Sequence, residues 1–219
     1  MRFANRTQAG RLLAKKLAKY ANRENVIVLG IPRGGVPVAF QVAQALHVPL
    51  DVFICRKLGV PGQEELALGA VATGGVRVLN DEIVGLLGMP QERIDRIAAV
   101  QQRELERREQ LYRGDRPPLQ VRGQTVILVD DGVATGSNML AAITALRRLE
   151  PARIVVAVPV APPSTFARLR EEADEVICVD TPEEFYAIGQ FYEDFSQTTD
   201  EKVCELLRRS EHPAARKVA

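Results

Sequence analysis

Five short apolar runs, rich in valine and isoleucine, constrain the fold more than any other feature of the chain. They cover residues 26–31, 50–55, 125–129, 153–160 and 175–179. Each run is nearly continuous and does not alternate apolar with polar residues, which is the pattern of strands covered on both faces. We therefore predict a parallel sheet with helices on both of its sides.

Segments with helical character lie between most of these runs. They span about 6–21, 35–46, 137–149, 164–172 and 200–209. The last of them follows Thr198 and Thr199 and begins at Asp200, residues that are typical of a helix cap. The alternation of strands and helices predicts an α/β fold built on a doubly wound parallel sheet.

One connection is too long for this pattern. About seventy residues separate the second run from the third, far more than an ordinary loop needs. We expect a single domain over residues 1–219 with an insertion at about 56–122. Its glycine- and proline-rich start predicts a flexible loop, which is followed by a hairpin and then by a long charged helix at 91–112. The partial apolar stripe of that helix is typical of a surface or interface helix.

Composition excludes several classes of protein. The chain has 219 residues, of which 46% are hydrophobic and 26% charged, so it is expected to be a soluble globular protein. Its net charge of +1 argues against a protein that binds nucleic acid through bulk positive charge. The longest apolar runs are too short to cross a membrane, and the amphipathic start lacks the pattern of a signal peptide, so we expect a cytoplasmic protein.

The segment 126–139 carries the strongest functional signal. Four apolar residues are followed by Asp130 and Asp131, and a small polar turn then opens a helix. In open α/β sheets ligands bind beyond the carboxyl ends of the strands, so both acids should face a ligand. Backbone N–H groups at the start of the helix would form a cradle for a monophosphate. The cradle residues are Ala134, Thr135, Gly136, Ser137 and Asn138.

This segment differs from the common nucleotide-binding loops. It lacks the Gly-Lys-Ser/Thr of the triphosphate loop and the glycine fingerprint of dinucleotide sites. Paired carboxylates beside a phosphate cradle suit a sugar phosphate, because the acids accept hydrogen bonds from ribose hydroxyls while the turn holds the 5′-phosphate.

The same segment resembles the signature of the type I phosphoribosyltransferases, which bind phosphoribosyl pyrophosphate. The resemblance extends to a pyrophosphate loop after the first strand, formed by Pro32, Arg33, Gly34 and Gly35. It also extends to Arg56 and Lys57, which match the base of the family's flexible catalytic loop. The family's fold and activity are implied, with Asp130, Asp131, Arg56 and Lys57 as catalytic residues. Mg²⁺ would be held through phosphoribosyl pyrophosphate and the acid pair.

The acceptor is left open by the sequence. In this family a small hood covers the acceptor, and residues 181–197 are the candidate here. Phe185, Tyr186, Phe191 and Tyr192 could stack on a planar base, or they could simply pin the carboxyl-terminal segment to the domain. A hypoxanthine or guanine acceptor is disfavoured, because Ala134 replaces the acid that those enzymes carry.

Two functions remain as hypotheses. The first is an enzyme that transfers phosphoribose to a nitrogenous, nucleobase-like acceptor and releases pyrophosphate. The second is a regulatory protein of the same fold that senses phosphoribosyl pyrophosphate or a nucleotide. The presence of Arg33, Arg56 and Lys57 favours the enzyme. We expect a small-molecule acceptor as the partner, no nucleic acid or membrane, and a homodimer.

Overall fold

The computed structural model describes residues 1–60 and 62–211. Its main sheet has five parallel strands in the order β2-β1-β6-β7-β8. The strands are β1 (Val26–Gly30), β2 (Leu50–Val52), β6 (Thr125–Val129), β7 (Arg153–Val160) and β8 (Glu175–Asp180). This confirms the predicted α/β fold with a doubly wound parallel sheet. The order reverses between β1 and β6, and such a switch point is where these folds bind ligands.

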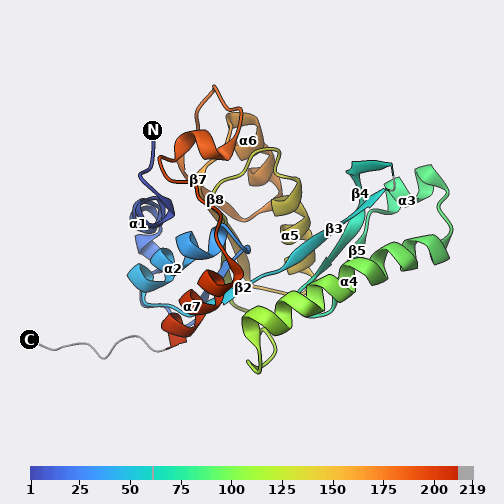
Figure 1. Ribbon diagram of the computed structural model, residues 1–219, viewed down its shortest axis with the longest axis horizontal. Helices are drawn as coiled ribbons and strands as arrows, with labels where there is room; N and C mark the ends of the chain where they lie inside the picture. The colour runs from blue at the N-terminus through green and yellow to red at the C-terminus, as the bar shows by residue number, and fades with distance from the viewer. Residues whose placement is uncertain (61, 212–219) are drawn as a thin grey trace, which may run out of the picture.

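Helices cover both faces of this sheet (Figure 1). The helices that pack against one face are α1 (Arg6–Lys16), α2 (Gly35–Leu46) and α7 (Asp200–Glu211), and those on the other are α5 (Ser137–Arg147) and α6 (Pro163–Glu172). Alternate residues of a strand enter opposite cores, as Ile127 and Leu128 do in β6, and both are fully buried. Burial on both faces explains the continuous apolar runs.

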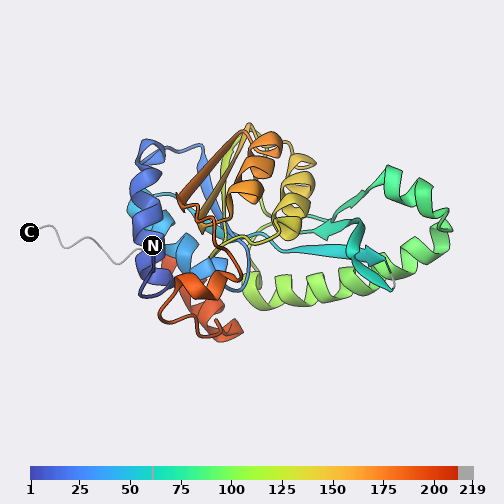
Figure 2. The same ribbon diagram turned by 90° about the horizontal axis from the view of Figure 1, so that it is seen from above.

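A second, antiparallel sheet projects from the main body together with a long helix (Figure 2). We call this region the extension, comprising residues 55–113. Its elements are β3 (Cys55–Val60), β4 (Gln63–Ala72), β5 (Val76–Leu79), α3 (Asp81–Leu87) and α4 (Gln91–Arg113). The hairpin and the long helix were expected. The flexible loop predicted at its start is wrong as local structure, because Arg56 and Lys57 lie in β3 and pair with β4.

The hood segment after β8 is held by the amino terminus. A short 3₁₀ helix, η2 (Ile188–Phe191), precedes Tyr192, which forms a parallel bridge with Phe3. The Phe3 N–H donates to the Phe191 carbonyl at 2.7 Å, and the Glu193 N–H donates to the Phe3 carbonyl at 2.8 Å. The amino-terminal segment and the hood segment therefore pair with each other after the last strand of the main sheet.

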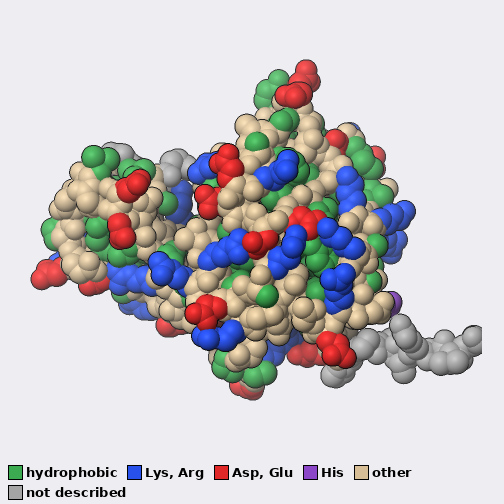
Figure 3. All heavy atoms as spheres, turned by 180° about the vertical axis from the view of Figure 1, so that it is seen from behind, with side chains coloured by type: hydrophobic (Ala, Val, Ile, Leu, Met, Phe, Trp, Pro, Cys, Tyr) green, Lys and Arg blue, Asp and Glu red, His purple; other side chains and the backbone are tan. Residues whose placement is uncertain are grey.

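The surface carries mixed charge. Cationic and anionic side chains lie interspersed over the back of the molecule (Figure 3), in keeping with a net charge of +1. Across the described part of the chain, no helix is long and apolar enough to cross a membrane.

Candidate active site

Two loops meet at the switch point between β1 and β6. The first, after β1, contains Pro32 to Gly35, and the second, after β6, runs from Asp130 to the start of α5. Gly35 lies so close to the second loop that an added Cβ would stand 2.7 Å from the Val129 carbonyl oxygen and 3.0 Å from Asp130 Oδ1. Only glycine permits this approach. The predicted pyrophosphate loop and the acid pair are therefore side by side.

The first loop makes a tight turn into α2. The Ile31 N–H donates to the Val129 carbonyl of the neighbouring strand at 2.9 Å, and the Gly35 N–H donates back to the Ile31 carbonyl at 3.0 Å. The peptide bond between Pro32 and Arg33 is cis. Arg33 points towards the start of α7, where its guanidinium lies 3.8 Å from Asp200 Oδ1. The loop thus places one half-buried cation beside the amino terminus of α2.

The second loop carries the residues predicted to form a phosphate cradle and leads into α5. Gly136 has φ of +81°, a left-handed conformation that glycine adopts without strain. The Thr165 hydroxyl of α6 donates to the Ala134 carbonyl at 2.6 Å and so connects this loop to α6. Because the first N–H groups of a helix lack partners within it, this turn directs donors outward. Thr135 and Asn138 are exposed beside them, and the Thr135 and Ser137 hydroxyls lie 3.3 Å apart.

The acid pair begins the second loop and lies against Gly34 and Gly35 of the first loop. Asp130 Oδ1 accepts the Asp131 N–H at 2.8 Å. Burial, followed by the charge of Asp131, raises the pKa of the Asp130 carboxyl well above its usual range. Burial also raises the pKa of Asp131, although Arg6 opposes the rise. Keeping two adjacent, poorly hydrated carboxyl groups ionised costs free energy unless a cation or hydroxyl groups contact them. Such a pair is typical of a ligand site.

The two predicted lid residues lie side by side in β3. The Arg56 guanidinium donates to Gln101 Oε1 of α4 at 2.7 Å, so it is turned towards the extension's helix. Burial, followed by the charge of Arg108, lowers its pKa. Lys57 follows in the same strand, where successive side chains point to opposite faces.

The hood aromatics divide into two groups. Tyr192 is only 2% exposed, its ring packs against Phe3 and Phe195, and its hydroxyl donates to the Asp131 carbonyl at 2.5 Å. Phe191 is also buried and packs against Phe185. These contacts favour the pinning alternative, since a buried ring offers no face to a base. Tyr186 is the exposed member of the predicted set, at 87%.

Sequence reasoning missed three residues that the fold brings to this region. Arg6 binds Asp131 from α1, while Asp200 of α7 lies beside Arg33 and accepts the Tyr112 hydroxyl of α4 at 2.5 Å. One signal was available for Arg6, because a cation in the first turn of a helix opposes the helix dipole. No local pattern could have revealed Tyr112 or Asp200 as neighbours of the loop.

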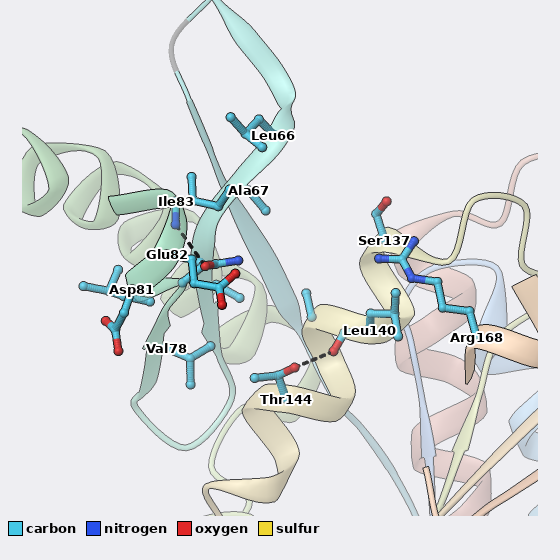
Figure 4. A pocket seen from close by; sticks show the side chains of 15 residues that line it. Leu66, Ala67, Val78, Asp81, Glu82, Ile83, Ser137, Leu140, Thr144 and Arg168 are labelled. Atoms are coloured by element: carbon cyan, nitrogen blue, oxygen red, sulfur yellow. Dashed lines mark hydrogen bonds between the residues drawn. The ribbon is translucent and has the colours of Figure 1, made fainter. Parts of the chain in front are cut away.

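A separate cleft of about 640 Å³ lies between the extension and the main body (Figure 4). It is lined by β4, β5 and α3 on one side and by α5 on the other, with Arg168 from α6 at one end. Ser137 is the one residue of the predicted phosphate cradle among its lining residues, and neither acid of the pair lines it. The cleft therefore adjoins the candidate site without coinciding with it.

Comparison with known proteins agrees with this geometry. Curated relatives from two strains of Mycobacterium tuberculosis, named provisionally as phosphoribosyl transferases, are 45% identical over 208 residues and match 95% of this chain. The chain spans about half the length of these relatives, at 47%.

Solved structures are similar as well. The crystal structure of the TT1426 protein from Thermus thermophilus has 46% identity and a TM-score of 0.86, covering 94% of this chain and 98% of that one. The structure of the AQ2163 protein from Aquifex aeolicus, at 13% identity and a TM-score of 0.51, covers 84% of this chain and 78% of that one and is alike in fold alone. The family model described as the phosphoribosyl transferase domain matches residues 4–196. The chain therefore belongs to the phosphoribosyl transferase domain family.

Proposed function

We propose that the protein transfers phosphoribose from phosphoribosyl pyrophosphate to a nitrogenous, nucleobase-like acceptor and releases pyrophosphate. The observation that carries the proposal is the meeting of the two loops at the switch point, with the acid pair between them. Gly35 is pressed against Val129 and Asp130, so a ligand that filled both loops would lie across the two carboxylates. A ribose with a phosphate at one end and a diphosphate at the other has this shape.

Each group of residues has a distinct task in this proposal. Ala134 to Asn138 hold the 5′-phosphate through backbone N–H groups and hydroxyls. Pro32 to Gly35 hold the pyrophosphate, with Arg33 as the permanently charged donor. The acid pair accepts hydrogen bonds from the ribose hydroxyls. The bond between ribose C1 and the diphosphate oxygen breaks, the acceptor nitrogen bonds to C1, and the acceptor loses a proton.

The residues of the site fit Mg²⁺ only together with a diphosphate. Among the described residues no cluster of three or more histidine, cysteine or acidic side chains could hold a metal ion alone. Asp130 supplies the hard oxygen ligand that Mg²⁺ prefers, beside the loop proposed for the diphosphate. Mg²⁺ bound there would neutralise charge on the leaving diphosphate. Positive charge developing on the ribose would lie near the carboxylates.

Arg56 and Lys57 are proposed to act from β3 as catalytic residues on the diphosphate side. In the structure Arg56 binds Gln101, so its participation requires that this hydrogen bond exchange for one to the ligand. Closure of the extension over the site would exclude water from a reactive sugar cation. Tyr186 is the exposed hood ring that could contact the acceptor.

The experiment is pyrophosphate release from phosphoribosyl pyrophosphate with Mg²⁺ and a panel of nucleobases. Release that depends on one base identifies the acceptor. Asp130→Asn should abolish it, whereas Glu171→Gln, an exposed carboxylate on α6, should have no effect. Binding of phosphoribosyl pyrophosphate without release for any base would favour the sensor, and absence of binding would contradict both functions.

A further inference from the structure

Arg6 is a largely buried cation at the start of α1 that reaches the acid pair. Its Nε lies 2.8 Å from Asp131 Oδ2, and the side chains of Arg6 and Asp131 are only 12% and 10% exposed. The two residues are 125 positions apart in the chain. An ion pair so poorly hydrated contributes only when its geometry is good, and it leaves a costly charge behind when one partner is removed.

The same guanidinium also holds the hood. Its NH1 donates to the Ser196 carbonyl at 2.7 Å, and its carbon atom lies 4.0 Å from the centre of the Phe195 ring. A cation over an aromatic face is attracted by the ring's electron density. The Tyr192 hydroxyl donates to the Asp131 carbonyl from the same side. Arg6 thus joins the hood to Asp131 by three kinds of contact.

Asp131 in turn lies against the pyrophosphate loop. A Cβ added to Gly34 would stand 2.0 Å from Asp131 Oδ2, the same oxygen that binds Arg6. That oxygen is therefore held between Arg6 and the backbone of Gly34. Asp130 differs, because its Oδ1 accepts the Asp131 N–H and its nearest loop neighbour is Gly35.

We propose that Arg6 is a positioning residue that divides the tasks of the two acids. Arg6 holds Asp131 Oδ2 as a bracket between the hood and the pyrophosphate loop, so Asp131 meets the ribose from a fixed position, while Asp130 is the acid of the pair that would also meet Mg²⁺. This inference rests on the proposed function for the identity of that ligand. The bracket itself depends only on the contacts described above.

A double-mutant cycle on Arg6→Ala and Asp131→Asn tests the bracket. The readout is the dissociation constant of phosphoribosyl pyrophosphate with Mg²⁺, measured by calorimetry. Each single variant should weaken binding about tenfold, as loss of an outer-shell partner commonly does, and the double variant should be no weaker than either single one. Arg6→Lys should restore part of the affinity. Asp130→Asn should weaken binding in addition to the effect of Arg6→Ala.

Arg2→Ala is the matched control. Arg2 also donates to the hood, to the Tyr192 carbonyl at 3.4 Å, but it makes no contact with Asp131. Its removal should leave the affinity unchanged. If Arg6→Ala lowers the melting temperature while the affinity stays at the wild-type value, Arg6 only stabilises the fold and the inference is overturned. Independent effects of Arg6 and Asp131 would overturn it as well.

A second readout separates this inference from the proposed function. Hydrogen exchange without ligand should become faster in Arg6→Ala both in the hood, at 191–196, and in the pyrophosphate loop, at 33–35. Arg2→Ala should affect the hood alone. Faster exchange confined to the hood in both variants would overturn the bracket. A wild-type protein that fails to bind phosphoribosyl pyrophosphate would contradict the proposed function, and the exchange experiment would still decide on the bracket.

Discussion

The two sheets of this protein differ in how completely they are buried. In the main sheet every residue of β1 and β6 is buried, and the helices on both faces complete two apolar cores. In the extension, β5 alternates buried and exposed positions, and α3 has no buried residue at all. Its strands β3 and β4 still meet α4 through buried side chains such as Leu58, Leu68 and Leu105, with the polar contact between Arg56 and Gln101 in addition. The loops at the switch point therefore rest on the more completely buried of the two sheets.

The largest expected effect is a cavity in the main sheet. Leu128→Ala removes a fully buried side chain from β6 and should lower the free energy of unfolding by about 3 kcal/mol. Leu86→Ala in α3 should change it by less than about 0.5 kcal/mol, because Leu86 is 81% exposed. Urea unfolding measures both. Equal losses would contradict the contrast between the two regions.

A smaller effect is expected from two glycines with similar backbone angles. Gly136→Ala and Gly75→Ala each force a left-handed conformation, which costs about 1 kcal/mol. A Cβ at Gly136 would also stand 3.0 Å from Thr165 Cγ2, whereas one at Gly75 would meet nothing within 4 Å. Gly136→Ala should therefore destabilise more. Of the two variants, only Gly136→Ala should weaken binding of a nucleoside monophosphate, which titration calorimetry can measure. Equal affinities of the two variants for that ligand would argue against the phosphate cradle.

Loss of a polar contact in the extension should have a local effect of about 1 kcal/mol. Arg56→Ala removes the hydrogen bond to Gln101, a bond of ordinary strength. Amides of α4 near Gln101 should exchange faster, while those of β6 keep their protection. Arg77→Ala is the comparison, because its exposed pair with Asp95 should contribute little. An increase in exchange throughout β6 would show that the two regions unfold together.

The smallest effect concerns acid stability at the edge of the main sheet. Burial raises the pKa of Glu175, but the hydrogen bonds from Lys19 and Tyr20 outweigh it, so the pKa is lower than in the unfolded chain. Glu175 therefore stabilises the fold above its unfolded pKa, and this contribution is lost as pH falls through its folded pKa. Glu175→Gln should cost less than about 1 kcal/mol at pH 7 and nothing at pH 2. Thermal unfolding at both pH values measures the difference.

In the extension, the corresponding carboxylate is that of Glu104, which is half-buried. Hydrogen bonds from Arg107 and Arg108 lower the pKa of Glu104 to about 2. Its titration should be visible by nuclear magnetic resonance without a change in the cooperativity of unfolding. Loss of structure coinciding with that titration would place Glu104 among the residues that hold α4 in position.

The sequence predicted the parts of the fold that depend on burial. Continuous apolar runs at 125–129 and 153–160 became β6 and β7, and the string after Val129 predicted a loop of acids and a helix start. The run at 50–55 was wrong at its end, because the chain leaves the main sheet after Val52 and a new strand starts at Cys55. An apolar run does not reveal which sheet its residues join.

The contacts of the site were harder to predict, since they join distant parts of the chain. Glycines at 34 and 35 predicted close approach, and the structure supplies the neighbours that they approach, Asp131 and Asp130. Arg6 lies in a predicted helix, but its partner is 125 residues away. The burial of Tyr192 depends on Phe3 at the opposite end of the chain. The local pattern of residue types along the sequence cannot reveal contacts between residues so far apart.

At the base of the extension, Asp51 pairs with Arg113 at 3.1 Å and with Arg116 at 3.5 Å. The chain therefore leaves the main body and returns to it at nearly the same point. These ion pairs fasten the two ends of the extension together beside β2. The extension is thus anchored on the strand next to β1, the strand whose carboxyl end leads into the loop at 32–35.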